Sequence, residues 1–135
     1  MTSQPQIAPV IFWPDDNPES ALETQIREAA IQIMEVLGVG YSEAVYHQAL
    51  EVELRLRGLK YESKPPLPVL YKGHAVARLE PDLVVEKEMV VELKAYGSRF
   101  NGRNQLERYL RHGAYKQGLL VNFSTKPVQF ISMTL

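Results

Sequence analysis

The sequence has no cysteine and only three histidines among its 135 residues. The lack of cysteine excludes disulfide bonds, zinc sites built on thiolates and cysteine nucleophiles, and it fits a reducing compartment. With so few histidines, we expect any bound metal to be held by oxygen ligands. The apolar stretch over residues 7–13 is short and contains Pro9, so it resembles neither a signal peptide nor a membrane span. We therefore expect a cytoplasmic protein that does not insert into a membrane.

A large excess of charge of either sign is also lacking, since the formal net charge is −1 and the sequence pI is about 6.3. The overall field of such a protein does not attract phosphate, so nucleic-acid binding would require a local basic patch. Hydrophobic residues make up 45% of the chain and charged residues 23%, which is ordinary for a globular domain. The length fits one domain.

The chain divides into an N-terminal arm and this domain. Residues 1–20 hold four of the nine prolines and show no helical periodicity, so we expect an arm there rather than an element, and the domain over residues 21–135. Ile11, Phe12 and Trp13 are apolar enough to pack on the body or on a second copy. A homo-oligomer formed through the arm is therefore one alternative.

Hydrophobic periodicity predicts three helices and six strands. We expect helices over residues 21–37, from Ser42 as N-cap to about residue 57, and over 103–112, with Gly38 and Gly58 as stop signals. In the second helix we expect the inward face to hold Val45, Ala49, Val52 and Leu56. We expect strands over residues 69–71, 74–79, 82–85, 89–95, 118–123 and 128–133. This order predicts an α+β or mixed α/β fold with helices packed on a central sheet.

Two carboxylates are predicted to face each other across neighbouring strands. If residues 86–88 form a hairpin loop, Val85 pairs with Met89 and Asp82 lies opposite Glu92 on the same face, with Lys94 two residues further. The reverse face is then continuously apolar and consists of Leu83, Val85, Met89, Val91 and Leu93. A slip of one residue would move Asp82 onto that apolar face, so burial favours this register.

Opposed carboxylates repel each other, by roughly 4 kcal/mol at ~4 Å and an effective dielectric of about 20. Lys94 offsets part of this repulsion, and a divalent cation such as Mg²⁺ offsets it fully. The alternative is that Glu92 and Lys94 are solvated residues on an exposed sheet face. The local conflict between Asp82 and Glu92 is typical of a metal site without its metal, but these three residues alone fit both readings.

Pro81-Asp82 followed by Glu92-Leu93-Lys94 resembles the signature of the PD-(D/E)XK nuclease superfamily. The resemblance implies a restriction-endonuclease-like core, a central mixed sheet flanked by helices. It also implies that Asp82 and Glu92 bind Mg²⁺ or Mn²⁺ with the carbonyl of Leu93, and that Lys94 assists the attacking water.

Two further motifs extend the resemblance. Gly40, Glu43 and Tyr46 match the G-x-x-E-x-x-Y pattern, which names the GxxExxY family within the superfamily, over roughly residues 26–123. This implies that Glu43 completes the metal site, although an acidic residue at a helix N-terminus is also favoured by the macrodipole alone. Gln105 and Tyr109 match a Q-x-x-x-Y pattern, which in related branches of the superfamily helps to position substrate.

The required basic patch lies next to these motifs. Residues 99–116 hold one acidic side chain and five Lys or Arg side chains, four of which we expect to contact phosphate: Arg99, Arg103, Arg108 and Arg111. An ordinary solvated helix face is the alternative. The sequence thus predicts a Mg²⁺- or Mn²⁺-dependent nuclease acting on DNA, or less favourably RNA. The main rival is a non-catalytic nucleic-acid- or protein-binding module that keeps the nuclease scaffold.

Overall fold

The computed structural model describes residues 11–13, 20–97, 102–113 and 115–134. Within them the helices are α1 (Ala21–Leu37), α2 (Glu43–Leu56) and α3 (Gly102–His112). The strands are β1 (Ile11–Trp13), β2 (Tyr61–Ser63), β3 (Leu67–Tyr71), β4 (His74–Leu79), β5 (Leu83–Val85), β6 (Met89–Lys94), β7 (Gln117–Asn122) and β8 (Gln129–Thr134).

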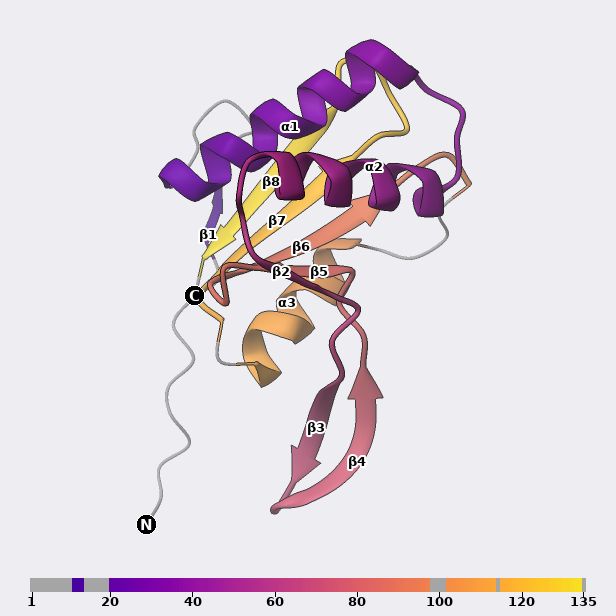
Figure 1. Ribbon diagram of the computed structural model, residues 1–135. Coiled ribbons are helices and arrows are strands. Elements are labelled where there is room, and N and C mark those ends of the chain that lie inside the picture. Colours follow the sequence, from indigo (N-terminus) through magenta and orange to yellow (C-terminus); the bar gives the residue numbers. More distant parts are fainter. Residues whose placement is uncertain (1–10, 14–19, 98–101, 114, 135) are drawn as a thin grey trace.

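Six of these strands form one mixed sheet in the order β1-β8-β7-β6-β5-β2, and β3 and β4 form a separate hairpin. Strands β6 and β7 are parallel, with α3 as the crossover between them, and all other neighbours are antiparallel. Helices α1 and α2 cover one face of the sheet and α3 covers the other (Figure 1). The predicted mixed α+β fold with a central sheet flanked by helices is confirmed.

The core lies in two layers, one on each face of the sheet. The larger layer packs α1 and α2 on the face that includes Leu83, Val91 and Leu93. The smaller layer packs Leu106 and Leu110 of α3 on the opposite face. Neighbouring strand residues point to opposite faces, so both faces of the central strands are buried and nearly every residue of β5 and β6 is apolar.

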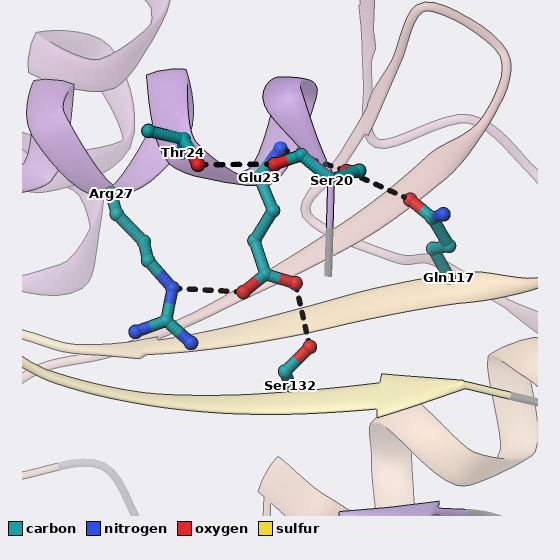
Figure 2. Close-up of polar contacts among 6 residues, drawn as sticks. All are labelled: Ser20, Glu23, Thr24, Arg27, Gln117 and Ser132. Carbon is teal, nitrogen blue, oxygen red and sulfur yellow. Dashed lines mark hydrogen bonds and ion pairs between the residues drawn. The ribbon is translucent and has the colours of Figure 1, made fainter. Parts of the chain in front are cut away.

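A buried polar cluster fastens α1 to strand β8 (Figure 2). Ser20 caps the helix by accepting a hydrogen bond from the Glu23 amide at 3.1 Å. The Glu23 carboxylate accepts one hydrogen bond from Arg27 Nε at 2.8 Å and another from Ser132 Oγ at 2.6 Å. The Arg27 guanidinium also lies over the Phe130 ring, 4.8 Å from its centroid. This cluster sets the position of the first turns of α1 on the sheet.

The structure corrects the predicted inward face of α2. Val45, Val52 and Leu56 are 38%, 45% and 78% exposed, and the buried residues are instead Tyr46, His47, Leu50 and Leu54. Ala49 alone of the predicted four packs against the core, partly buried. Apolar side chains occur on two sides of this helix, so periodicity alone does not choose between them. Stacking of Tyr46 on Phe123, with ring centroids 4.5 Å apart, accompanies burial of the other side.

Two short strands were not predicted. Strand β1 lies within residues 1–20, where no element was expected, and pairs with β8 from Ile11↔Thr134 to Trp13↔Ser132. Strand β2 pairs with β5 at the opposite edge of the sheet. Each has three residues, too few for a periodic pattern, and each is held by a distant partner in the sequence.

The β5–β6 turn contains two residues in the left-handed region, Glu86 at φ 53° and Lys87 at φ 55°. Glu86 has a structural use there, since its carboxylate accepts a hydrogen bond from the Lys60 amide at 2.6 Å. The conformation of Lys87 costs about 1–2 kcal/mol, which glycine avoids at a smaller entropic cost. We expect Lys87→Gly to be about 0.5–1 kcal/mol more stable in urea unfolding than Lys87→Ala, which keeps the strain. Equal stabilities would contradict this.

Candidate active site

The β5–β6 hairpin brings Asp82 and Glu92 together. The pairs Leu83↔Val91, Val84↔Val90 and Val85↔Met89 confirm the predicted register. Asp82 and Glu92 lie one step beyond the first of these pairs, and the Asp82 amide donates to Glu92 Oε1 at 3.3 Å. The predicted apolar face is buried in the α1–α2 layer. The burial argument for the register therefore holds.

Asp82 is held by hydrogen bonds from two backbone amides, one to its side chain and one to its carbonyl. Its carboxylate Oδ2 accepts a hydrogen bond from the Leu93 amide at 2.8 Å, and its carbonyl accepts one from the Lys64 amide at 2.9 Å. The side chain is half-buried. These contacts fix Asp82 at the junction of strands β5 and β6 with the end of β2.

Glu92 is buried, with 4% of its surface exposed, so the alternative of a solvated residue on an open sheet face is wrong. Its Oε2 accepts a hydrogen bond from the Tyr109 hydroxyl of α3 at 3.2 Å. Burial, followed by the adjacent Asp82 carboxylate, raises the pKa of Glu92 to about 9. Burial and the Glu92 charge likewise raise the pKa of Tyr109. The environment of Glu92 therefore opposes an isolated negative charge.

Asp82 also borders a cavity of about 450 Å³ on the α2 side of the sheet. Glu43 at the start of α2 and Leu93 of β6 line the same cavity, together with His47, Ser63 and Lys64. Glu92 is not among its lining residues. Within the described residues, no group of three or more His, Cys, Asp or Glu side chains is close enough to hold a metal ion. The predicted ligands thus occur as two overlapping sets that share Asp82.

Lys94 ends strand β6 between the sheet and α3. Its carbonyl accepts a hydrogen bond from the Phe123 amide at 2.7 Å, and its side chain is half-buried. Gly102, the first residue of α3, packs tightly here, because a Cβ added to it would lie 3.2 Å from Lys94 Cδ and 2.6 Å from Leu120 Cδ1. Lys94 and Glu92 occupy the same side of β6, as the alternation of a strand requires.

The Tyr46 of the G-x-x-E-x-x-Y motif is structural in this fold. The side chain is fully buried, and its hydroxyl donates a hydrogen bond to the Gly38 carbonyl at 2.6 Å. It thereby ties the end of α1 to the beginning of α2, the turn that carries Glu43. The motif therefore fixes the turn between α1 and α2, and with it the position of the Glu43 carboxylate.

Helix α3 presents its predicted residues on different sides. Tyr109 faces Glu92, and Gln105, one turn earlier, is half-buried. Three of the predicted phosphate-binding arginines are exposed: Arg103, Arg108 and Arg111. Arg111 is engaged in an ion pair with Glu107, with its Nε 3.1 Å from Glu107 Oε1. Arg99 lies outside the described residues.

A comparison with protein families matches residues 20–132 to the model of the PD-(D/E)XK nuclease superfamily. The chain belongs to this superfamily. The match spans both carboxylates of the β5–β6 hairpin, Lys94, and all three helices of the fold.

A similar fold is seen in a solved protein, described as the crystal structure of SSO0001, with a TM-score of 0.52 and 19% sequence identity. The alignment covers 67% of this chain and 48% of that one, so it spans about half of the solved chain's length. This likeness concerns the fold alone. A comparison with curated proteins found no match. In the described part of the chain, no helix is both long and apolar enough to span a membrane.

Sequence reasoning missed part of this candidate site. His47 is buried at the cavity and lies 2.8 Å from Ser63 Oγ through its Nε2, with Glu51 4.0 Å away. Its position four residues after Glu43 places both on one side of α2, which was an available signal. Ser63 and Lys64 carry no such signal, because β2 itself was not predicted.

Proposed function

We propose that this chain is a metal-dependent nuclease that hydrolyses phosphodiester bonds, and that it belongs to the GxxExxY group of its superfamily. The proposal rests on the Asp82 and Glu92 carboxylates, which meet across neighbouring strands with Glu92 buried and Lys94 two residues on. An energetically unfavourable pair of acids on a rigid sheet is costly to keep for stability alone. It is a common feature of sites that act on charged substrates.

The residues around this pair suit Mg²⁺ or Mn²⁺. Asp82, Glu92, the Leu93 carbonyl and Glu43 offer only oxygen donors, the type that these ions prefer. The high pKa of Glu92 indicates that a positive charge close by is needed for its ionised form. A bound divalent ion lowers the pKa of water and neutralises charge that develops on a phosphate.

The remaining side chains have roles that follow from their positions. Lys94 orients the attacking water and stabilises phosphate charge, and Tyr109 holds the Glu92 carboxylate in place. Gln105 orients substrate near Tyr109. The phosphate backbone is contacted by the basic side chains of and before α3: Arg99, Arg103, Arg108 and Arg111.

The test is cleavage of labelled single- and double-stranded DNA and RNA in Mg²⁺, Mn²⁺ or EDTA. We expect metal-dependent cleavage that falls by about 10²-fold or more in Lys94→Ala, because one transition-state stabiliser is removed. Lys87→Ala, in the turn that precedes β6, is the matched control and should cleave like the wild type. Full cleavage by the Lys94→Ala or Asp82→Ala protein would refute the mechanism.

A non-catalytic nucleic-acid-binding module is the second candidate. It is favoured by the arrangement of the acids, since the described residues contain no cluster of three or more metal-ligating side chains. In that case calorimetry would detect nucleic-acid binding, with or without Mg²⁺ binding, and no cleavage would occur on any of the four substrates. Metal-dependent turnover would exclude this candidate.

A further inference from the structure

The β3–β4 hairpin is a ribbon that extends away from the body on the side of the sheet where α3 lies (Figure 1). Its base is anchored, because the paired residues Leu67 and Leu79 pack against the α3 layer. Beyond this base every residue over 70–78 is exposed, including Leu70, Tyr71 and Val76 at 58%, 62% and 62%. A two-stranded hairpin gains little stability by itself. Exposed apolar side chains of this kind favour a partner.

The charge of the ribbon differs from that of the whole chain. Residues 64–79 contain Lys64, Lys72 and Arg78 and no Asp or Glu, whereas the chain has a net charge of −1. The exposed arginines of α3 lie on the same side of the sheet as the ribbon, and the two elements are in contact. Helices α1 and α2, on the opposite side, carry two arginines and six of the sixteen acids of the chain: Glu23, Glu28, Glu35, Glu43, Glu51 and Glu53. Among these elements, net positive charge therefore lies on α3 and the ribbon, and net negative charge on α1 and α2.

The ribbon also leads into the candidate active site. Strand β4 is followed by Glu80 and Pro81 and then directly by Asp82. At the same base, Lys64 precedes strand β3 and lines the cavity beside Asp82. Its amide donates a hydrogen bond to the Asp82 carbonyl at 2.9 Å. Both ends of the segment that forms the ribbon therefore lie beside Asp82.

We infer that the β3–β4 ribbon binds double-stranded DNA by entering its major groove. The major groove of B-DNA is about 12 Å wide and admits a two-stranded ribbon, whereas the deep, narrow major groove of duplex RNA does not. Lys72 and Arg78 contact phosphates, and Leu70 and Val76 offer apolar contact to thymine methyl groups. The inference deepens the proposed nuclease function by naming its substrate class, but the binding step itself needs no cleavage.

The test is fluorescence anisotropy of a labelled DNA duplex in EDTA, where cleavage does not occur. We expect the double variant Lys72→Glu/Arg78→Glu to bind at least tenfold more weakly than the wild type. We also expect the salt dependence of log K to become shallower by about two, one for each lost phosphate contact. An RNA duplex of the same sequence should bind the wild type more weakly than the DNA.

The chain offers a matched control for the charge change. Lys72 and Lys87 are both exposed turn lysines in the left-handed region, at φ 49° and φ 55°. Lys72→Glu should weaken DNA binding, and Lys87→Glu should leave it within about twofold of the wild type. Hydrogen exchange provides a second measurement on the wild type, in which added DNA should protect amides within residues 67–79.

Each contrary result shows whether the ribbon inference or the proposed nuclease function fails. Unchanged binding by the double variant, equal affinity for duplex RNA, or a ribbon left unprotected by DNA would overturn the inference, even if cleavage is observed. Ribbon-dependent DNA binding without any metal-dependent cleavage would support the inference and refute the nuclease function. A dimer in light scattering that dissociates in the double variant would identify a second copy as the occupant and overturn it.

Discussion

Glu23→Ala is expected to lower the free energy of unfolding by about 3–5 kcal/mol, a large part of the stability of a typical domain. Glu23 and Arg27 are 1% and 7% exposed, so removal of the carboxylate leaves a buried guanidinium without its counter-ion (Figure 2). Ser132 Oγ loses its acceptor in the same step. Within the described residues, Arg27 Nη2 already has no hydrogen-bond partner, which leaves little to compensate for the loss.

The same helical spacing provides the control for this prediction. Glu107 and Arg111 form a second pair four residues apart, but their side chains are 30% and 43% exposed. Glu107→Ala should cost about 0.5 kcal/mol or less in urea unfolding. The double variant Glu23→Leu/Arg27→Met should recover most of the loss, because it removes both buried charges together. A cost for Glu23→Ala as small as that for Glu107→Ala would show that the buried pair is not needed.

The second large effect concerns the pH dependence of stability in the metal-free protein. The pKa of Glu92 rises from an ordinary value of 4.5 to about 9 on folding, chiefly through burial. Between these values the folded protein binds a proton that the unfolded chain has released. The contribution of Glu92 to stability is therefore fully present below about pH 4.5 and is lost as the pH rises towards 9, by up to about 1.4 kcal/mol per pH unit.

Glu92→Gln mimics the protonated acid and does not titrate. In EDTA its stability should equal that of the wild type below about pH 4.5 and exceed it by up to about 4 kcal/mol at pH 7.5, as measured by urea unfolding at each pH. Glu88→Gln, an exposed carboxylate of the same hairpin, should stay within about 0.5 kcal/mol of the wild type. Addition of Mg²⁺ should stabilise the wild type and not Glu92→Gln. Parallel pH curves for wild type and Glu92→Gln would contradict the buried-acid assignment.

The sequence was sufficient to predict the β5–β6 hairpin and with it the meeting of Asp82 and Glu92. Burial determines which register is allowed there, because only one register places five apolar residues on the same face. The sequence was not sufficient to predict the contact between Glu92 and Tyr109, which are 17 residues apart and meet only after α3 crosses the sheet. The burial of Glu92, and therefore its high pKa, depends on that packing.

Other features were beyond prediction for the same reason. The inward face of α2 depends on which of two apolar stripes meets the sheet, and the stacking of Tyr46 on Phe123 accompanies one choice. The cavity beside Asp82 requires β2, whose three residues show no pattern of their own. Features set by local periodicity were predicted correctly, whereas those set by contacts between distant segments were not.

The order of the strands has a consequence for self-association. Strands β1 and β2, at the two edges of the main sheet, have only three residues each. Of the four interior strands, β5 also has three, and β6, β7 and β8 have six. A short edge leaves few free backbone amides and carbonyls for another chain to pair with. By pairing with Thr134, Met133 and Ser132, the segment Ile11–Trp13 covers half of a six-residue strand that would otherwise be the edge of the sheet. We expect the pairing of Ile11–Trp13 with β8 to disfavour edge-to-edge association of two copies.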